Sequence, residues 1–267
     1  MRWSWGFGTS SPLRAAGGTT GGRPVPRRSS PSPEPGASRP RRKAPRVLGV
    51  IPAHDEEASI ARTVKSLAEV EGITGVVVLA DGCTDRTAEE ATSAGARVLV
   101  AARRMGKGGA VESALDRLDA TDVYVLVDGD VGDTASEAAL VLAEVLAGRA
   151  DLAIGRLPPS RGGGFGLVKR AAGAAIRTLT GFRAEEPLSG QRAVTRMALQ
   201  ACRPLAGGFG LETAMTVDAL RLGLRVREVP VEMAHRPTGR SLSGFLHRFG
   251  QGADIFRAMV PRALNLR

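Results

Sequence analysis

Residues 123–130 read Val-Tyr-Val-Leu-Val-Asp-Gly-Asp, and this octet points to the fold class. Its first five residues are apolar and mostly β-branched or aromatic, which predicts a buried strand. The strand ends in two carboxylates, Asp128 and Asp130, with Gly129 between them. In an open α/β sheet, ligands bind at the carboxyl ends of the strands. Two acids on a tight turn suit a hard divalent cation that carries substrate phosphates, so the octet predicts an enzyme that handles a metal–diphosphate.

Outward from the octet, short apolar runs alternate with helical patterns. Strands are expected at 47–51, 75–80, 97–101, 123–127 and 151–155, and helices at 56–69, 84–94 (capped by Thr84), 107–118 and 135–147. The second half is less regular, with helices expected at 164–180 and 211–222, strands at 193–195 and 226–231, and an amphipathic segment from Ser241 to about Val260. This alternation predicts right-handed βαβ units, and therefore a single α/β domain whose mostly parallel sheet is flanked by helices.

The charge of the chain is concentrated at its start. The net charge is +10, but residues 1–46 hold ten basic residues and one acid, whereas the rest of the chain holds 27 basic and 26 acidic residues. Residues 1–45 are rich in Pro, Gly, Ser and Arg and have no hydrophobic period, which predicts a disordered basic tail. The tail is either a dispensable extension or a weak electrostatic contact with an anionic membrane or nucleic acid. Because the folded part is nearly neutral, we do not expect nucleic acid as a partner.

Cysteine usage and hydropathy indicate the compartment. The two cysteines form neither a disulfide framework nor a CxxC or Cys/His metal spacing, and a reducing compartment is the default for such a chain. No run of about 18 apolar residues is present. We therefore expect a cytoplasmic protein, with peripheral contact at the cytoplasmic membrane face as a further expectation.

Acidic side chains follow three of the predicted strands. The first strand ends in Pro52-Ala53-His54-Asp55-Glu56-Glu57, the second in Asp81-Gly82-Cys83-Thr84-Asp85 and the fourth in Asp128-Gly129-Asp130. In a parallel sheet these ends lie at one edge. Acids gathered there are costly unless a cation or a donor-rich ligand joins them. A nucleotide base and ribose supply such donors, and a metal ion supplies the charge.

These motifs, with Gly106-Lys107-Gly108 before a helix, resemble a GT-A glycosyltransferase of the family 2 type over roughly residues 46–236. Within that group the chain is similar to dolichol-phosphate sugar transferases and glucosyl-phosphoglycerate synthases. The shared segments are Pro187-Leu188-Ser189-Gly190, Gly208-Phe209-Gly210-Leu211-Glu212 and His235-Arg236. The resemblance implies a Rossmann-like GT-A domain at 46–267, made of a nucleotide-sugar half (46–155), an acceptor half (156–240) and a C-terminal amphipathic helix (241–267).

The resemblance also implies roles for individual residues. Asp130 and Glu212 would be catalytic, and Asp130 and His235 would hold Mg²⁺ or Mn²⁺. The residues expected to bind the nucleotide-sugar are Pro52, His54, Glu56, Asp81, Lys107, Asp128 and Gly129. Those expected at the acceptor are Ser189, Gly190, Arg236 and Arg240. The metal would neutralise charge on the departing nucleoside diphosphate.

Four positions depart from the family pattern. An aromatic residue often stands in place of His54, Asn in place of Asp55, Asp in place of Ala80, and Ser in place of Cys83. A Q-x-x-R-W motif is also missing, so a processive polysaccharide synthase is not expected.

The predicted function is metal-dependent transfer of one sugar, of the hexosyltransferase type, from a UDP- or GDP-sugar to an anionic acceptor. A polyprenyl phosphate and a phosphorylated small molecule are both candidate acceptors, because arginines recur in the acceptor half at Arg183, Arg192, Arg196, Arg236 and Arg240. A homodimer is a further expectation. The alternatives are a catalytically silent nucleotide-binding module of the same fold and a sugar nucleotidyltransferase.

Overall fold

The computed structural model describes residues 44–119, 121–158, 166–208, 210–233, 254 and 256–264. Contacts within the chain separate residues 1–43 from Ala44–Arg267, and all elements below belong to the second unit. Its seven strands are β1 Val47–Ala53, β2 Ile73–Asp81, β3 Arg97–Ala101, β4 Val123–Leu126, β5 Leu152–Arg156, β6 Arg192–Thr195 and β7 Val226–Pro230. They form one sheet in the order β3-β2-β1-β4-β6-β5-β7.

The sheet is mostly parallel, which confirms the predicted fold class. Strands β3, β2, β1 and β4 run parallel to one another, and β5 is parallel to β7. Strand β6 alone is antiparallel to both of its neighbours, β4 and β5. Because β6 is reversed, the residues that precede it lie at the edge where β1, β2 and β4 end.

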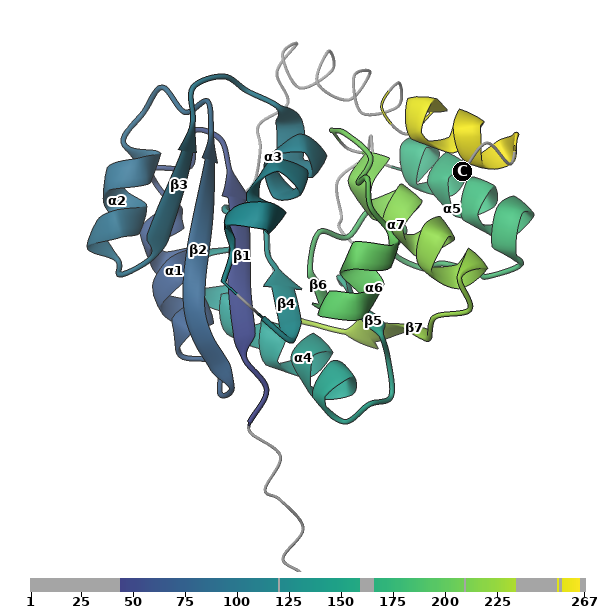
Figure 1. The fold of residues 1–267 in the computed structure, drawn as a ribbon, viewed down its shortest axis with the longest axis horizontal. Helices are drawn as coiled ribbons and strands as arrows, with labels where there is room; N and C mark the ends of the chain where they lie inside the picture. Colours follow the sequence, from purple (N-terminus) through teal and green to yellow (C-terminus); the bar gives the residue numbers. More distant parts are fainter. Residues whose placement is uncertain are drawn as a thin grey trace, which may run out of the picture. The chain divides into compact units, whose positions relative to one another are not determined.

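Helices cover both faces of the sheet (Figure 1). They are α1 Ile60–Ala68, α2 Thr87–Ser93, α3 Gly106–Ala114, α4 Ala138–Leu146, α5 Gly166–Thr180, α6 Arg196–Ala201 and α7 Gly210–Arg221, with 3-10 turns at Leu115–Arg117 and Gly132–Glu137. Helices α1, α2 and α4 pack on one face through residues such as Val64 and Leu142. Helices α3, α6 and α7 pack on the other face through residues such as Val111 and Met215. The alternating inward side chains of the strands fill both layers.

Beyond α7 lies a further helical layer. Ile176 of α5, Val217 of α7 and Met259 of the helical segment 256–264 share a third apolar cluster. Arg262 anchors this segment, since its Nε donates to Asp218 of α7 at 2.7 Å. Residues 241–253 of the predicted C-terminal amphipathic helix lie outside the described residues. Within the described part of the chain, no helix is long and apolar enough to cross a membrane.

One local prediction was wrong, and one short helix was missed. Thr84 does not cap a helix: α2 begins at Thr87, and the Thr84 backbone N–H donates to Asp55 Oδ1 at 2.7 Å. The short helix α6 was not predicted, because six residues are too few to show a helical period. Its N-cap is Thr195, whose hydroxyl accepts from the Ala198 N–H at 3.1 Å.

Candidate active site

The carboxyl edge of the sheet gathers residues from both halves of the chain. Parallel strands β1, β2 and β4 end there. The antiparallel pairing of Leu126 with Arg192 brings residues 189–191 to the same edge, directly beside Asp128. Helices α3 and α7 begin above it, with Lys107 in the first turn of α3 and Glu212 in the first turn of α7.

Lys107 joins two carboxylates of this edge. Its ammonium forms an ion pair with Asp128 Oδ1 and a second, at 2.8 Å, with Glu212 Oε1. The side chain of Lys107 is 17% exposed and that of Glu212 only 5% exposed. Burial disfavours the ammonium, but the charges of Asp128 and Glu212 outweigh it and raise the pKa of Lys107 above its ordinary value. Lys107 therefore stays charged at neutral pH between the two carboxyl groups.

Gln191 holds the other side of Asp128. Its Nε2 donates to Asp128 Oδ2 at 2.8 Å, and its Oε1 accepts from the Asp128 backbone N–H at 3.3 Å. Sequence reasoning missed this fully buried residue, although it directly follows the Pro187–Gly190 motif. With Lys107 on one oxygen and Gln191 on the other, the carboxylate of Asp128 is held in one orientation.

Gly190 makes this arrangement possible. A Cβ atom at this position would lie 2.5 Å from both carboxylate oxygens of Asp128 and would overlap with Lys107 Nζ. The backbone of the 187–190 loop can therefore approach the Lys107–Asp128 pair only because residue 190 has no side chain. Ser189, the other residue of this loop predicted at the acceptor, is buried, and its hydroxyl accepts from the Gln191 N–H at 3.2 Å.

The loop after β4 packs against the loop after β1. Gly129, which precedes Asp130 in the first loop, lies beside Glu56 of the second. A Cβ atom on Gly129 would lie 3.3 Å from Glu56 Cγ, so the glycine lets the two loops pack closely. The Glu56 carboxylate accepts from the Ser59 hydroxyl at 3.0 Å. Thr63 of α1 supports the turn by donating to the Gly129 carbonyl at 2.9 Å and accepting from the Gly132 N–H at 2.9 Å. Thr63 was missed in the sequence, where its signal is a polar residue on the apolar face of α1.

Asp81 and His54 connect the ends of β2 and β1. The Asp81 carboxylate accepts from the backbone N–H groups of Met105 and Gly106, each at 2.7 Å. It thus holds the start of α3, and with it Lys107. His54 Nδ1 lies 2.8 Å from the Asp81 carbonyl oxygen, and Pro52 is buried within β1. The nucleotide contacts expected from these three residues stay predictions.

Two arginines expected near the acceptor do not lie there. Arg192 is 1% exposed, donates through Nε to the Ser189 carbonyl at 2.8 Å and through Nη1 to Thr216 at 3.1 Å. Burial lowers its pKa to about 10, so the guanidinium stays charged and braces the 187–190 loop from inside. Arg196 follows β6, and its backbone N–H donates to the Asp122 carbonyl at the opposite edge of the sheet. Its position there follows from the reversed direction of β6, which sequence periodicity does not reveal.

His235, Arg236 and Arg240 lie outside the described residues, and their metal and acceptor roles stay predictions. Among the described residues, Asp128, Asp130 and Glu56 offer only oxygen ligands. Carboxylate oxygen is the donor that Mg²⁺ and Mn²⁺ prefer. The donor set at this edge therefore fits such a cation.

Comparisons with known proteins agree with this geometry. The model of the family described as glycosyl transferase family 2 matches residues 50–198. Glycosyltransferase AglJ of Haloferax volcanii is 30% identical over 221 residues, which cover 81% of this chain and 72% of that protein. Glucosyl-3-phosphoglycerate synthase of Mycolicibacterium paratuberculosis is 33% identical over 213 residues, but the match spans only 63% of that longer protein and 68% of this chain.

A solved structure extends the likeness to three dimensions. Glucosyl-3-phosphoglycerate synthase of Mycobacterium tuberculosis, crystallised with Mn²⁺, UDP-glucose and phosphoglyceric acid, has a TM-score of 0.69. It is 29% identical, and the alignment covers 82% of this chain and 79% of that one. The same enzyme has been crystallised with Mg²⁺ and UDP, with a TM-score of 0.70 and 27% identity. The ordered carboxyl edge, the family match and these likenesses lead to one assignment: the chain is a GT-A glycosyltransferase that belongs to glycosyl transferase family 2.

Proposed function

We propose that this glycosyltransferase moves a single sugar from a UDP- or GDP-sugar to a phosphorylated acceptor, with Mg²⁺ or Mn²⁺ bound at Asp130. The observation that carries the donor half is the clamp on Asp128, whose two oxygens are held by Lys107 and Gln191. A carboxylate fixed in this way can accept hydrogen bonds from ribose or sugar hydroxyls without first having to be oriented. Family membership favours transfer over the silent-module and nucleotidyltransferase alternatives.

The cation would supply positive charge to the departing nucleoside diphosphate. The other charges belong to the protein. Lys107 lies within the same group of acids and provides a fixed ammonium beside the donor. Glu212 is paired with Lys107 and nearly buried, so its carboxyl group is held where it can accept a hydrogen bond from a sugar or acceptor hydroxyl. The similar enzyme crystallised with Mn²⁺, UDP-glucose and phosphoglyceric acid supports the proposed kinds of metal, donor and acceptor.

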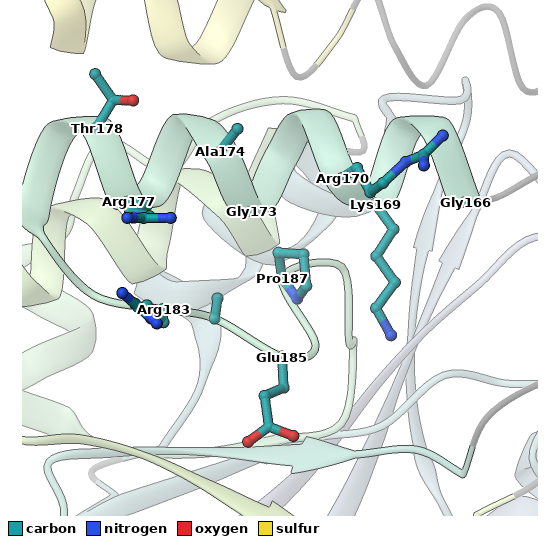
Figure 2. A pocket seen from close by; sticks show the side chains of 11 residues that line it. Gly166, Lys169, Arg170, Gly173, Ala174, Arg177, Thr178, Arg183, Glu185 and Pro187 are labelled. Atoms are coloured by element: carbon teal, nitrogen blue, oxygen red, sulfur yellow. The ribbon is translucent and has the colours of Figure 1, made fainter.

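A basic pocket supports an anionic acceptor. A hollow of about 1020 Å³ lies between α5 and residues 183–187. Its lining includes four cationic residues, Lys169, Arg170, Arg177 and Arg183, against the single acid Glu185. Figure 2 shows the Lys169 side chain pointing from α5 toward the 183–187 segment.

Several of these charges are available to a ligand. Lys169 pairs with Glu186 at 2.6 Å, and Glu185 pairs with Arg156 at 2.7 Å. Arg170, Arg177 and Arg183 are exposed and form no ion pair with the described residues. Guanidinium groups of this kind suit phosphate and carboxylate, which they can bind through two parallel hydrogen bonds.

The 187–190 loop links this pocket to the donor site. Pro187 lines the pocket, and Gly190 lies against Lys107 and Asp128. Three residue steps separate them, so their Cα atoms are within about 11 Å of each other. An acceptor whose anionic group lies in the pocket can therefore present a hydroxyl or phosphate oxygen close to the sugar.

Thermal unfolding with UDP or GDP and Mn²⁺ tests the donor half. We expect one nucleotide to raise the melting temperature only when the metal is present, and Asp130→Ala to abolish that rise. At about one hundred times its Kd, a ligand adds about 2.7 kcal/mol of stability. Asp133→Ala is the matched control, because Asp133 is an exposed carboxylate that contacts only Arg62, at 3.4 Å. Equal shifts in the wild-type and Asp130→Ala proteins would refute the assignment of the metal to Asp130.

Acceptor kinetics test the pocket. Nucleoside diphosphate release is measured with phosphoglyceric acid and with a polyprenyl phosphate as probe acceptors. We expect Arg177→Glu with Arg183→Glu to raise the acceptor KM at least about tenfold, which is the effect of losing about 1.4 kcal/mol of binding. Arg86→Glu, an exposed charge reversal on the cap of α2, should leave the KM unchanged. An unchanged KM in the double variant would refute binding of the acceptor in this pocket.

A cytoplasmic location, peripheral membrane contact and a homodimer stay predictions from the sequence.

A further inference from the structure

His54, Asp55 and Cys83 come together beside the site. His54 and Asp55 follow β1, and Cys83 follows the neighbouring strand β2. One ring nitrogen, one carboxylate oxygen and the thiol sulfur all lie within 4.8 Å of one another. These three residues are among those that depart from the usual family pattern in the two motifs, where an aromatic residue, Asn and Ser are common. The departures therefore coincide in space as well as in the sequence.

The ring of His54 is oriented for binding a cation. Its Nδ1 lies 2.8 Å from the Asp81 carbonyl oxygen, which can only accept, so the ring proton resides on Nδ1. The lone pair of the neutral ring is then on Nε2, which lies 3.5 Å from Asp55 Oδ2. A histidine that donates its other ring N–H to a carbonyl is the usual arrangement of a metal-binding histidine.

Asp55 is held in place by its neighbours. Among the described residues it is the one non-glycine residue with a left-handed backbone, with a φ of 55°. Its Oδ1 accepts from the Thr84 N–H at 2.7 Å, and that bond ties the loop after β1 to the loop after β2. The second oxygen, Oδ2, faces His54. Asp55 is exposed and the other two residues are half-buried, which leaves a path for an ion from solvent.

The donor set distinguishes this cluster from Asp130. Nitrogen, sulfur and one carboxylate oxygen are the ligands of Zn²⁺, whereas Mg²⁺ and Mn²⁺ prefer oxygen alone. Tetrahedral zinc with bonds of about 2.0–2.3 Å places its ligand atoms roughly 3.3–3.8 Å apart. The His54–Asp55 separation of 3.5 Å meets that requirement, and the thiol sulfur lies within 4.8 Å of a ring nitrogen of His54 and of a carboxylate oxygen of Asp55.

We propose that His54, Asp55 and Cys83 form a second cation site that is selective for Zn²⁺ over Mg²⁺ and Mn²⁺. Zinc binds as a four-coordinate ion, with water or a ligand in the fourth position. The Cys83 thiol, whose Sγ lies 3.4 Å from the Ala53 carbonyl oxygen, loses its proton to solvent as the Zn–S bond forms. Zinc binding needs no donor or acceptor, although the site shares His54 with the residues expected to bind the nucleotide.

Cobalt substitution tests the proposal directly. The tag-free full chain is titrated with Co²⁺, and absorption is recorded in the near ultraviolet, where a thiolate bound to Co²⁺ gives a charge-transfer band. We expect one equivalent to produce that band, Zn²⁺ to abolish it, and excess Mg²⁺ to leave it unchanged. Cys83→Ser should lose the band and weaken Zn²⁺ binding at least about tenfold, since even changes around a ligand cost about 10–100-fold.

Other variants distinguish this site from other metal-binding residues of the chain. Asp130→Ala should keep the band, because that carboxylate serves the other cation. His235→Ala and His247→Ala should keep it as well, whereas His54→Gln should weaken it. Circular dichroism and thermal unfolding confirm that Cys83→Ser is folded, which is expected because Ser is common at this position in the family. A wild-type protein without the band, or a band that persists in Cys83→Ser, would overturn the proposal.

Discussion

At the scale of single residues, Lys107 is the charge on which the site depends. It lies between Asp128 and Glu212, and these two carboxylates would face each other with no cation between them if the ammonium were removed. Arg192 is charged but lies below the loop, where it holds Ser189 rather than the acids. Lys107 thus combines a structural role in the protein with its proposed role beside the donor.

Lys107→Met should lower the free energy of unfolding by about 3 kcal/mol, because breaking a buried ion pair from one side leaves its partners uncompensated. Urea denaturation of the metal-free protein at neutral pH measures this change. Lys65→Met, an exposed lysine on α1, is the control and should stay within about 0.5 kcal/mol of wild type. If both variants unfold at the same urea concentration, the two carboxylates do not need the lysine.

At the scale of elements, helix starts are held by capping side chains, which come from another segment in α3 and from the preceding residue in α6. The start of α3 is held by Asp81 at the end of β2, through the N–H groups of Met105 and Gly106. Helix α6 is capped by Thr195 of its own chain segment, at the opposite edge of the sheet. The first cap determines where Lys107 lies, and the second has no connection with the site.

Asp81→Ala and Thr195→Ala should each cost about 0.5–2 kcal/mol of stability, the usual effect of losing a helix cap. Only Asp81→Ala should also reduce the metal-dependent thermal shift with UDP or GDP, because the Gly106-Lys107 turn loses its anchor. Parallel urea and thermal-shift measurements compare the two variants. A nucleotide response that survives in Asp81→Ala would show that α3 keeps its position without the cap.

At the scale of the whole molecule, paired carboxylates govern the response to acid. Asp151 precedes β5 and binds Arg225, which precedes β7, through three hydrogen bonds of 2.8–2.9 Å. The hydrogen bonds from the Arg225 side chain lower the pKa of Asp151 below its ordinary value, and burial opposes this only in part. A depressed pKa means that the unfolded chain binds more protons than the folded one between the two pKa values.

The stability contributed by Asp151 should therefore be fully present above about pH 4, the ordinary pKa of an aspartate, and be lost as the pH falls below it. We expect Asp151→Asn to be clearly less stable than wild type at pH 6, and the difference to shrink as the pH falls below about 4, as measured by urea unfolding. Asp119→Asn is the control, because Asp119 and its partner Arg97 are both largely exposed. A difference between Asp151→Asn and wild type that does not change with pH would contradict this account.

Local sequence patterns were enough to predict the α/β class, the positions of the seven strands and the acids at three strand ends. These features depend on local patterns: apolar runs, helical periods and turn residues. Sequence resemblance added the family, an expected place for Lys107 near the nucleotide and an expected catalytic role for Glu212. The same local patterns could not predict the contacts that Gln191 and Thr63 make at the site, because each contacts a residue more than sixty positions away.

Which residues from the second half of the chain lie beside the acids at the carboxyl edge became clear from the three-dimensional packing. The antiparallel direction of β6 places Gly190 and Gln191 beside Asp128, buries Arg192 beneath them and sends Arg196 to the far edge. A strand of four residues has the same sequence pattern in either direction, and its direction is set by which neighbours bury it. The meeting of His54, Asp55 and Cys83 likewise required β1 and β2 to pair in register, a non-local result that no single motif contains.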